Sequence, residues 1–296
     1  MTGFICIDKP ENMTSFTAAN LVKRITGSKK AGHTGTLDPM ATGVLTVALS
    51  GATRFIELIP DHEKSYTARI LLGVTTDTLD ITGTITGSFP VSVTPCEAKE
   101  AALSFYGEQL QTPPMYSAVS KDGVRLYNLA RRGKEIEREK RKINITEIRA
   151  YDFSDNEFSL DVTCSAGTYI RSLADDIGKK LGCGAVLKSL RRTRANGFST
   201  DDCITIEKLR EICENGELGN YVMSVSRVLS QYKEVHVTAA QAVRFKNGGE
   251  LFLDRIGNPK GDGFFRVFSP ENEFLGIGEK NVETGCLAVK RVLQGE

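Results

Sequence analysis

The sequence has few of the residues from which metal sites and disulfide frameworks are built. Its three histidines (33, 62 and 236) are far apart and not at ligand spacing, and its seven cysteines are odd in number and form no C-x-x-C pair. The cysteines are scattered over positions 6, 96, 164, 183, 203, 213 and 286. Such a set predicts small core residues, with neither a zinc site nor disulfides. We therefore expect any chemistry to proceed without a metal or other cofactor.

Long apolar runs are also absent. None approaches the roughly 20 residues that span a bilayer, and the N-terminal segment 1–8 lacks the basic region and apolar stretch of a leader peptide. A cytoplasmic location with no membrane contact is predicted. The motifs G-x-x-x-x-G-K-[ST], G-x-G-x-x-G, G-x-S-x-G and H-E-x-x-H are missing too. Their absence argues against nucleotide hydrolysis, dinucleotide redox chemistry, serine hydrolysis and zinc proteolysis.

Charge of one sign is not in excess over the whole chain, but it is unevenly placed. The 38 Lys and Arg nearly balance the 37 Asp and Glu, giving a net charge of +1. Residues 1–199 carry a net charge of +4 and residues 200–296 one of −3. Nine basic and four acidic residues lie in Lys121–Lys142, and four basic residues lie in Lys188–Arg194 (KSLRRTR). Such patches can contact phosphates, although a solvated helix face and an ordinary loop would show the same pattern.

What is present is the composition of a globular protein. Of 296 residues, 40% are apolar and 25% charged, which predicts two domains with a packed core. Apolar alternation predicts strands over 4–7, 44–49, 66–72, 142–153 and 157–165. Helical spacing predicts helices over 16–25, 95–105 and 169–181, the first with Ser15 as N-cap and Gly27 as its stop. This mixed order predicts an α+β fold on a central, mostly antiparallel sheet flanked by helices.

A composition change near Tyr232 predicts a second, smaller domain. A short helix over 239–245 is followed by glycine-punctuated strands over 250–256, 264–268, 273–278 and 286–292. Short strands of this kind predict a small β-barrel. The predicted division is 1–232 and 233–296, with a basic insertion at about 119–142 in the first domain.

Chemistry is concentrated around Asp38. Four glycines lie between residues 27 and 43, and Asp38 stands in the turn Leu37-Asp38-Pro39. The glycines allow a bulky substrate to come close to the backbone, and the proline stiffens the turn that presents the carboxylate. An aspartate before proline is also a common turn former. Residue types alone favour that simpler interpretation.

The segment around this turn resembles a known signature. Gly32-His-Thr-Gly-Thr-Leu-Asp-Pro-Met-Ala-Thr-Gly-Val-Leu45 is similar to the catalytic loop of the TruB family, bacterial synthases that convert uridine 55 of tRNA to pseudouridine. Further family segments appear in the family's order over residues 4 to about 200, and a PUA-like C-terminal domain is matched more weakly. These segments are Asp8-Lys-Pro10, Lys64-Ser-Tyr66, Gly73 to Gly83, Pro113 to Ala118, Gly167 to Leu173 and Leu190-Arg-Arg-Thr193.

The resemblance implies a catalytic set of three residues. Asp38 would be the essential carboxylate, because remaking a glycosidic bond needs a nucleophile or a base beside C1′ and C6 of the uridine. Arg171 would pair with Asp38 and keep it charged and oriented. Tyr66 would stack on the target base and assist proton transfer. Whether Asp38 attacks C1′, attacks C6 or deprotonates the sugar stays open.

Four further positions are implied to bind the substrate. His33 would fill space left by flipped nucleotides, Tyr169 and Leu190 would line the uracil pocket, and Lys9 would support the active-site loop. Without the resemblance, Tyr66 on a strand and Leu190 at a helix end would be interpreted as core residues, and His33 as structural.

The implied function is therefore a tRNA pseudouridine-55 synthase with a pseudouridine synthase fold. The expected partner is tRNA, through its T arm and T loop, with the base flipped out of its stack. The basic insertion would clamp the T arm and KSLRRTR would contact phosphate. The acidic C-terminal domain would make a contact that is small or made with one face only, and the alternative is a structural domain that buries part of the catalytic sheet. We expect a monomer that needs no guide RNA or obligatory protein partner. A tRNA-folding chaperone role, and the same chemistry on another RNA, are the alternatives.

Overall fold

In the computed structural model, which describes residues 1–60, 62–117, 119–121, 123–130 and 132–294, the chain forms one large and one small principal sheet. The large sheet has nine strands, ordered β1-β3-β12-β4-β11-β10-β7, with β2 paired to β3 and β13 to β12. Its strands are β1 (Gly3–Lys9), β2 (Ala31–His33), β3 (Thr42–Leu49), β4 (Lys64–Leu72), β7 (Gly107–Gln111), β10 (Arg141–Ser154), β11 (Glu157–Cys164), β12 (Ala185–Ala195) and β13 (Phe198–Ser199). Each pairing between these described strands is antiparallel except that of β12 with β3. The predicted α+β fold on a mostly antiparallel sheet is confirmed.

The central strand β12 is the main element that the sequence did not predict. It lies between β3 and β4, with Arg192 opposite Gly43 on one side and opposite Tyr66 on the other. Four of its eleven residues are Lys or Arg. This charge made the segment look like a solvated loop in the sequence, although it forms a strand. Arg192 is nevertheless buried, because its guanidinium donates hydrogen bonds to backbone carbonyls. The interpretation of Leu190 as the end of a helix is wrong, since Leu190 lies within this strand.

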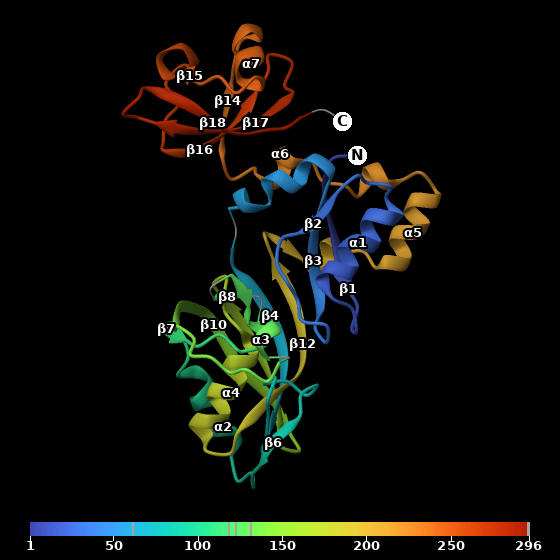
Figure 1. The fold of residues 1–296 in the computed structure, drawn as a ribbon, viewed down its shortest axis with the longest axis vertical. Helices are drawn as coiled ribbons and strands as arrows, with labels where there is room; N and C mark the ends of the chain where they lie inside the picture. Colours follow the sequence, from blue (N-terminus) through green and yellow to red (C-terminus); the bar gives the residue numbers. More distant parts are fainter. Residues whose placement is uncertain (61, 118, 122, 131, 295–296) are drawn as a thin grey trace.

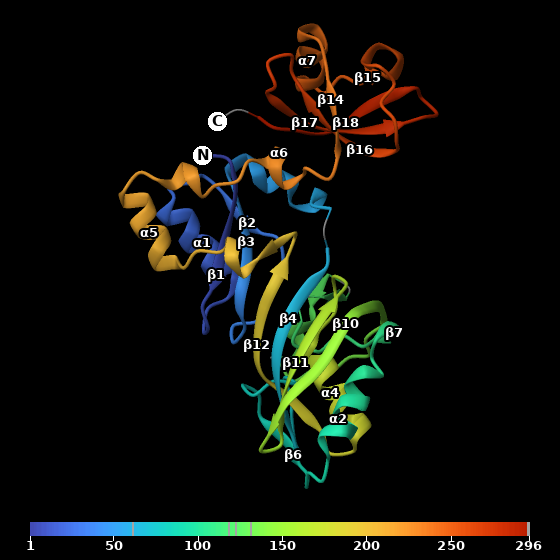
Figure 2. The ribbon, with the colours of Figure 1, turned by 180° about the vertical axis from the view of Figure 1, so that it is seen from behind.

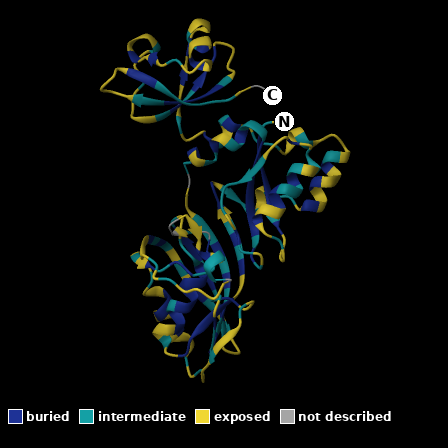
Figure 3. Ribbon diagram, in the orientation of Figure 1, coloured by how far each residue is buried: buried dark blue, intermediate teal, exposed yellow. Residues whose placement is uncertain are grey.

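Helices cover the sheet in two groups. The helix α4 packs on β12 and the helix α2 on β10, and both contribute to the largest apolar core. The helices α1 and α5 pack beside β1 and β3 around a second core. Figures 1 and 2, seen from opposite sides, show the helices grouped in this way, and Figure 3 shows the buried residues gathered between helices and sheet. The helices are α1 (Ser15–Ile25), α2 (Pro95–Leu103), α3 (Leu126–Ala130), α4 (Ile170–Leu181), α5 (Ile206–Glu214), α6 (Val225–Val228) and α7 (Ala239–Lys246).

Short elements complete this part of the chain. The 3₁₀ helices η1 (Ser50–Leu58), η2 (Thr200–Asp202) and η3 (Leu218–Asn220) join longer elements, and two small hairpins project from the sheet. The hairpins are β5 (Val74–Thr76) with β6 (Ile85–Ser88), and β8 (Ser120–Lys121) with β9 (Val124–Arg125). The predicted basic insertion contains β8, β9 and α3, whereas its residues 122 and 131 lie outside the described part.

A second sheet of five strands follows from Lys233. Its order is β14-β16-β17-β18-β15, around a core that includes Phe245, Phe265 and Leu287. Its elements are β14 (Lys233–His236), β15 (Leu251–Phe252), η4 (Leu253–Ile256), β16 (Gly263–Phe268), β17 (Phe274–Asn281) and β18 (Cys286–Val292). Figure 1 shows the sheet curling around this core, as in a PUA-like domain. The strand predicted over 250–256 is wrong beyond residue 252, where the chain forms η4.

The two sheets share an apolar contact. Phe4 on β1 and Phe55 on η1 are fully buried in the same cluster as Ile277 of the second sheet. Phe4 also exchanges two backbone hydrogen bonds of 2.8 Å with Met223. The smaller sheet is therefore packed against the larger one through side chains from both.

Among the described residues, no helix has both the length and the apolar character needed to cross a membrane.

Candidate active site

Ser15 holds the loop between β2 and β3, which carries Asp38, through hydrogen bonds to its backbone. The Ser15 hydroxyl accepts a hydrogen bond from the Leu37 amide (2.7 Å) and donates one to the Leu37 carbonyl (3.2 Å). Ser15 was predicted to cap α1, but the cap is Thr14, whose side chain accepts from the Thr17 amide. The correction matters, because Ser15 instead holds the residue next to Asp38.

Lys9 fixes the other side of the same turn. Its ammonium is buried and donates to the carbonyls of Pro10 (2.7 Å), Met13 (2.7 Å) and Pro39 (3.3 Å). Burial lowers the pKa of Lys9 to about 8, against an opposing attraction from Asp38. These contacts join Lys9 to the turn that carries Asp38, and its support of an active-site loop stays a prediction.

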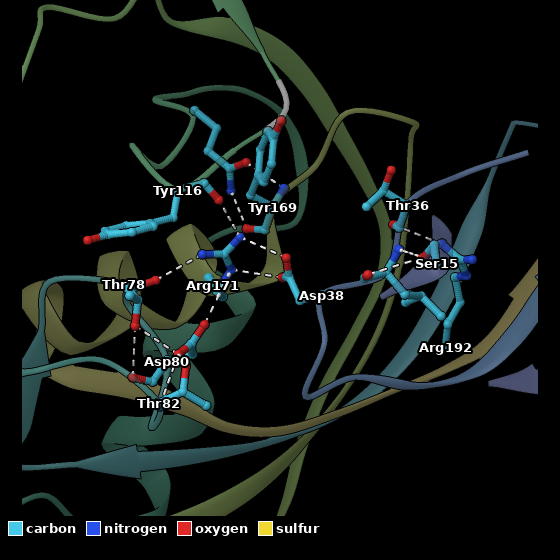
Figure 4. A network of polar contacts seen from close by, with 12 residues as sticks. Ser15, Thr36, Asp38, Thr78, Asp80, Thr82, Tyr116, Tyr169, Arg171 and Arg192 are labelled. Atoms are coloured by element: carbon cyan, nitrogen blue, oxygen red, sulfur yellow. Dashed lines mark hydrogen bonds and ion pairs between the residues drawn. The ribbon is translucent and has the colours of Figure 1, made fainter. Parts of the chain in front are cut away.

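Asp38 is paired with Arg171, as predicted. Arg171 lies in the first turn of α4, and its Nη2 and Nε lie 3.0 and 2.9 Å from the two carboxylate oxygens of Asp38. The same guanidinium donates to the carbonyls of Thr78 (3.0 Å) and Tyr116 (2.8 Å), so four contacts fix its orientation (Figure 4). A fork of this kind holds a carboxylate in one plane as well as neutralising it.

A second carboxylate, Asp80, stands behind this pair. Its Oδ2 lies 3.8 Å from Arg171 Nε, and its Oδ1 accepts hydrogen bonds from Thr78 Oγ1 (2.8 Å), Thr82 N (3.0 Å) and Thr82 Oγ1 (2.6 Å). Asp80 is buried, and Figure 4 shows it directed at the guanidinium. The family resemblance covered Asp80 without giving it a role. In the sequence, the cluster of polar residues Thr76-Asp-Thr-x-Asp80 was the one pattern that could have pointed to Asp80.

The surroundings of Asp38 have opposing effects on the pKa of its carboxyl group. Burial raises the pKa of the Asp38 carboxyl above its ordinary value, and the neighbouring Asp80 carboxylate adds to the rise. Arg171 opposes both effects by favouring the charged form. About a third of the Asp38 side chain stays exposed (32%), so the carboxylate can reach a substrate.

That exposed part of Asp38 lines a cavity of ≈ 720 Å³. Tyr66, Tyr169, Arg171 and Leu190 line the same cavity, so five of the seven predicted site residues converge on it. Such a volume suits a nucleoside-sized ligand. Tyr169 is held at the start of α4 by Gln111, whose side chain exchanges hydrogen bonds of 2.8 and 3.1 Å with its amide and carbonyl.

Tyr66 is the buried aromatic wall of this cavity. Burial raises the pKa of its hydroxyl to about 12, although the nearby Arg192 acts to lower it. The hydroxyl is therefore protonated at neutral pH, when it can exchange hydrogen bonds but is no phenolate base. Two further tyrosines to which the sequence analysis gave no role, Tyr116 and Tyr127, also line the cavity. Tyr127 belongs to α3, which brings the basic insertion to the cavity.

The remaining predicted residues lie elsewhere. His33, on β2, is not among the residues that line the cavity, and its Nδ1 is buried without a hydrogen-bond partner in the described part of the chain. Within KSLRRTR, Lys188 pairs with Glu157 and Arg191 pairs with Asp8. Arg192 is only 1% exposed. The predicted phosphate contact is therefore wrong for Arg192.

Within the described ranges, no group of three or more His, Cys, Asp and Glu is arranged to hold a metal ion.

Comparisons with known proteins assign this chain to a class. The family model described as "TruB family pseudouridylate synthase (N terminal domain)" matches residues 23–170, and two TruB C-terminal models match 171–230 and 234–293. The chain therefore has the fold of a pseudouridine synthase. Within that class, the chain belongs to the TruB family. The resemblance inferred from the sequence is thereby confirmed.

Relatives and solved structures agree with this assignment. The chain is 41% identical to the tRNA pseudouridine synthase B of Clostridium tetani, over 96% of this chain and 97% of the relative. It is also 41% identical to that of Azoarcus sp., over 98% and 94%. The crystal structure of a Cbf5-Nop10-Gar1 complex matches 99% of this chain and 85% of the other, with a TM-score of 0.75 and 25% identity. An H/ACA RNP bound to a substrate RNA containing 2′-deoxyuridine has the same fold, with a TM-score of 0.74, 23% identity and coverage of 99% and 85%.

Proposed function

We propose that this chain is a tRNA pseudouridine synthase that isomerises uridine 55 in the T loop. The observation that carries the proposal is the bidentate Asp38–Arg171 pair, placed at a nucleoside-sized cavity in a TruB-family chain. Support for tRNA as the substrate comes from relatives 41% identical over nearly the whole chain, which are named tRNA pseudouridine synthase B.

The reaction that this site would perform is an isomerisation. The C1′–N1 bond of uridine breaks, a C1′–C5 bond forms, and the proton lost from C5 is balanced by one gained at N1. Asp38 would start the sequence, by attack on C1′, by attack on C6 or by removing a proton from the sugar. Each route needs Asp38 ionised and aimed at the nucleotide. Arg171 would provide both conditions, and Asp80 would hold Arg171 in position.

The walls of the cavity would bind the flipped base. Tyr66 would stack on the uracil ring with its neutral hydroxyl near the transferred proton, and Tyr169 and Leu190 would close the pocket around the ring. Lys9 would keep the Asp38 turn in place. His33 lies outside the cavity lining, so its proposed role is contact with the remodelled T loop around the flipped base.

The division of labour along the chain follows from this proposal. Residues 1–232 would form the catalytic domain, with the insertion at about 119–142 clamping the T arm. Residues 233–296 would form a PUA-like domain whose acidic balance limits its RNA contact. We propose that the chain acts as a monomer, without guide RNA or protein partner, whereas the matched Cbf5 chain is in a complex with Nop10 and Gar1.

A tRNA-folding activity would accompany catalysis. The partly exposed Asp38 carboxylate lies in a cavity that accepts a base only after it has left its stack, so binding requires the T loop to open and re-form.

The decisive experiment maps pseudouridine on an unmodified tRNA transcript incubated with the protein alone. We expect product at uridine 55 from the wild type and none from Asp38→Asn. No wild-type product would refute the enzymatic proposal, and abundant product from Asp38→Asn would refute the role of Asp38. Acceleration of tRNA folding by the inactive Asp38→Asn variant would establish the second activity, and its absence would exclude it.

A further inference from the structure

A second cationic centre lies beside the active-site loop, apart from Arg171. A Cβ built on Gly35 would lie 3.3 Å from Nζ of Lys64 and 3.6 Å from Nη1 of Arg192. Both nitrogens therefore converge on the backbone of Gly35. In the view of Figure 4, Arg192 lies on the other side of Asp38 from Arg171.

Arg192 brings a buried charge that no acid balances among the described residues. Its guanidinium donates to the carbonyls of Val44 (2.8 Å), Gly35 (3.1 Å) and Thr36 (3.4 Å). These acceptors satisfy its hydrogen bonds but carry no net charge. The backbone before Asp38 is therefore held by hydrogen bonds from Arg192 and lies next to its positive charge.

Lys64 is the more exposed member of the centre. It lines the same cavity as Asp38 and is half-buried at the start of β4. No carboxylate of the described part of the chain pairs with it, unlike Lys179, Lys188 and Lys208. Burial and the positive charge of Arg192 both lower the pKa of Lys64, against an opposing influence of the Cys164 thiol.

The imidazole of His33 supplies no compensating negative charge. Burial and the positive charge of Arg192 lower the pKa of His33, so this neighbour of Arg192 favours its neutral form. A half-buried ammonium with a second cation behind it is costly on its own and is stabilised by an anion. Under the proposed function, the cavity that Lys64 lines binds one nucleotide of an RNA, whose backbone phosphates are such anions.

We propose that Lys64 binds a backbone phosphate of the RNA next to the target uridine, with Arg192 as the buried cation that strengthens the site. Lys64 would contact the phosphate directly. Arg192 would not touch the RNA; it would add positive charge beside Lys64 and hold the loop at Gly35 and Thr36. The ligand class rests on the proposed function, since it takes the bound polymer to be RNA. The contact itself is separate from the chemistry at Asp38.

The test compares Lys64→Met with Lys64→Arg and with Lys208→Met, a surface lysine on α5 that is paired with Glu211. Binding of a T-arm stem-loop is measured by fluorescence anisotropy between about 50 and 200 mM salt. One lost phosphate contact reduces the slope of log K against log salt by about 0.7 on single-stranded RNA. We expect that reduction and about tenfold weaker binding for Lys64→Met. Lys64→Arg should restore the slope, and Lys208→Met should leave it unchanged.

The position of the contact is tested with uncharged methylphosphonate linkages, placed one at a time within two nucleotides of the target. At one linkage the wild type should lose about tenfold in affinity while Lys64→Met loses nothing further. Equal losses for both proteins at every linkage would refute the proposal, as would a wild-type salt slope in Lys64→Met. Pseudouridine formation by the wild type is measured on the same unmodified stem-loop. Absence of product there would refute the proposed function alone, because the salt slopes report the contact without turnover.

Discussion

Replacing Arg171 by lysine separates the charge of its guanidinium from its geometry. Arg171 makes two contacts with Asp38, at 2.9 and 3.0 Å, and two with the carbonyls of Thr78 and Tyr116. A lysine ammonium keeps the positive charge but cannot hold both carboxylate oxygens in one plane. Arg171→Lys should therefore leave Asp38 ionised but poorly aimed.

The size of the effect follows from the contacts that are lost. A hydrogen bond to a charged group contributes about 1.5–3 kcal/mol. Loss of one of the two bonds to Asp38 should then slow the chemical step by about 10- to 150-fold. Arg171 is buried behind the partly exposed carboxylate of Asp38, so we expect the affinity for tRNA to change less than about threefold.

The assay is single-turnover pseudouridine formation with excess enzyme, alongside a separate binding titration. The matched control is Lys179→Arg, a surface change on the same helix that should leave both quantities unaltered. A rate for Arg171→Lys within about threefold of the wild type would refute the geometric argument. A loss of affinity equal to the loss of rate would place Arg171 in tRNA binding instead.

Four further outcomes are expected. The wild-type single-turnover rate should fall on acidification with an inflection above the ordinary aspartate pKa of about 3.9, because burial raises the pKa of Asp38; an inflection at or below that value would contradict this. The Lys9 pKa of about 8 lies below its ordinary value of 10.5, so between these two pH values the unfolded chain binds more protons than the folded one. In urea titrations, the free energy of unfolding relative to Lys9→Met should therefore rise with pH across that window, by at most about 1.4 kcal/mol per pH unit. A fall with pH would contradict the lowered pKa. Ser15→Ala should slow catalysis more than Thr14→Ala at similar stability, since Ser15 holds Leu37 whereas Thr14 caps α1; equal rates would exclude the anchor. Gly43→Ala should lower the thermal midpoint by more than about 5 °C, because its Cβ would overlap the Arg192 carbonyl at a φ of +100°; an unchanged midpoint would show that the strands separate freely.

Periodicity predicted the elements that follow simple patterns. The alternation of Tyr66–Leu72 and the helical spacing of 169–181 correspond to β4 and α4. It failed for β12, since charged residues there stay in a strand by bonding to backbone carbonyls and to acids from distant segments. Propensity describes a residue and its near neighbours, whereas such partners are fixed by the tertiary fold.

The candidate site was predictable to a similar extent. The partnership of Asp38 with Arg171 came from the family resemblance, because 133 positions separate the two residues and no spacing rule joins them. Asp80 and Lys64 lay in segments that match the family, but their significance depends on which charges surround them in space. The exchange of roles between Thr14 and Ser15 is a matter of one residue, within the ordinary uncertainty of helix starts.

The position of β12 between β3 and β4 has a consequence for the order in which the chain folds as it is synthesised. The strands β3 and β4 are complete at residues 49 and 72, whereas β12, which separates them in the sheet, begins only at Ala185. Until β12 has left the ribosome, each of these strands has an edge whose backbone groups lack their final partner. Closing so long a loop is slow relative to local contacts. The large sheet is therefore joined into one unit late in synthesis, and the cavity, whose walls include Tyr66 on β4 and Leu190 on β12, is completed at the same moment.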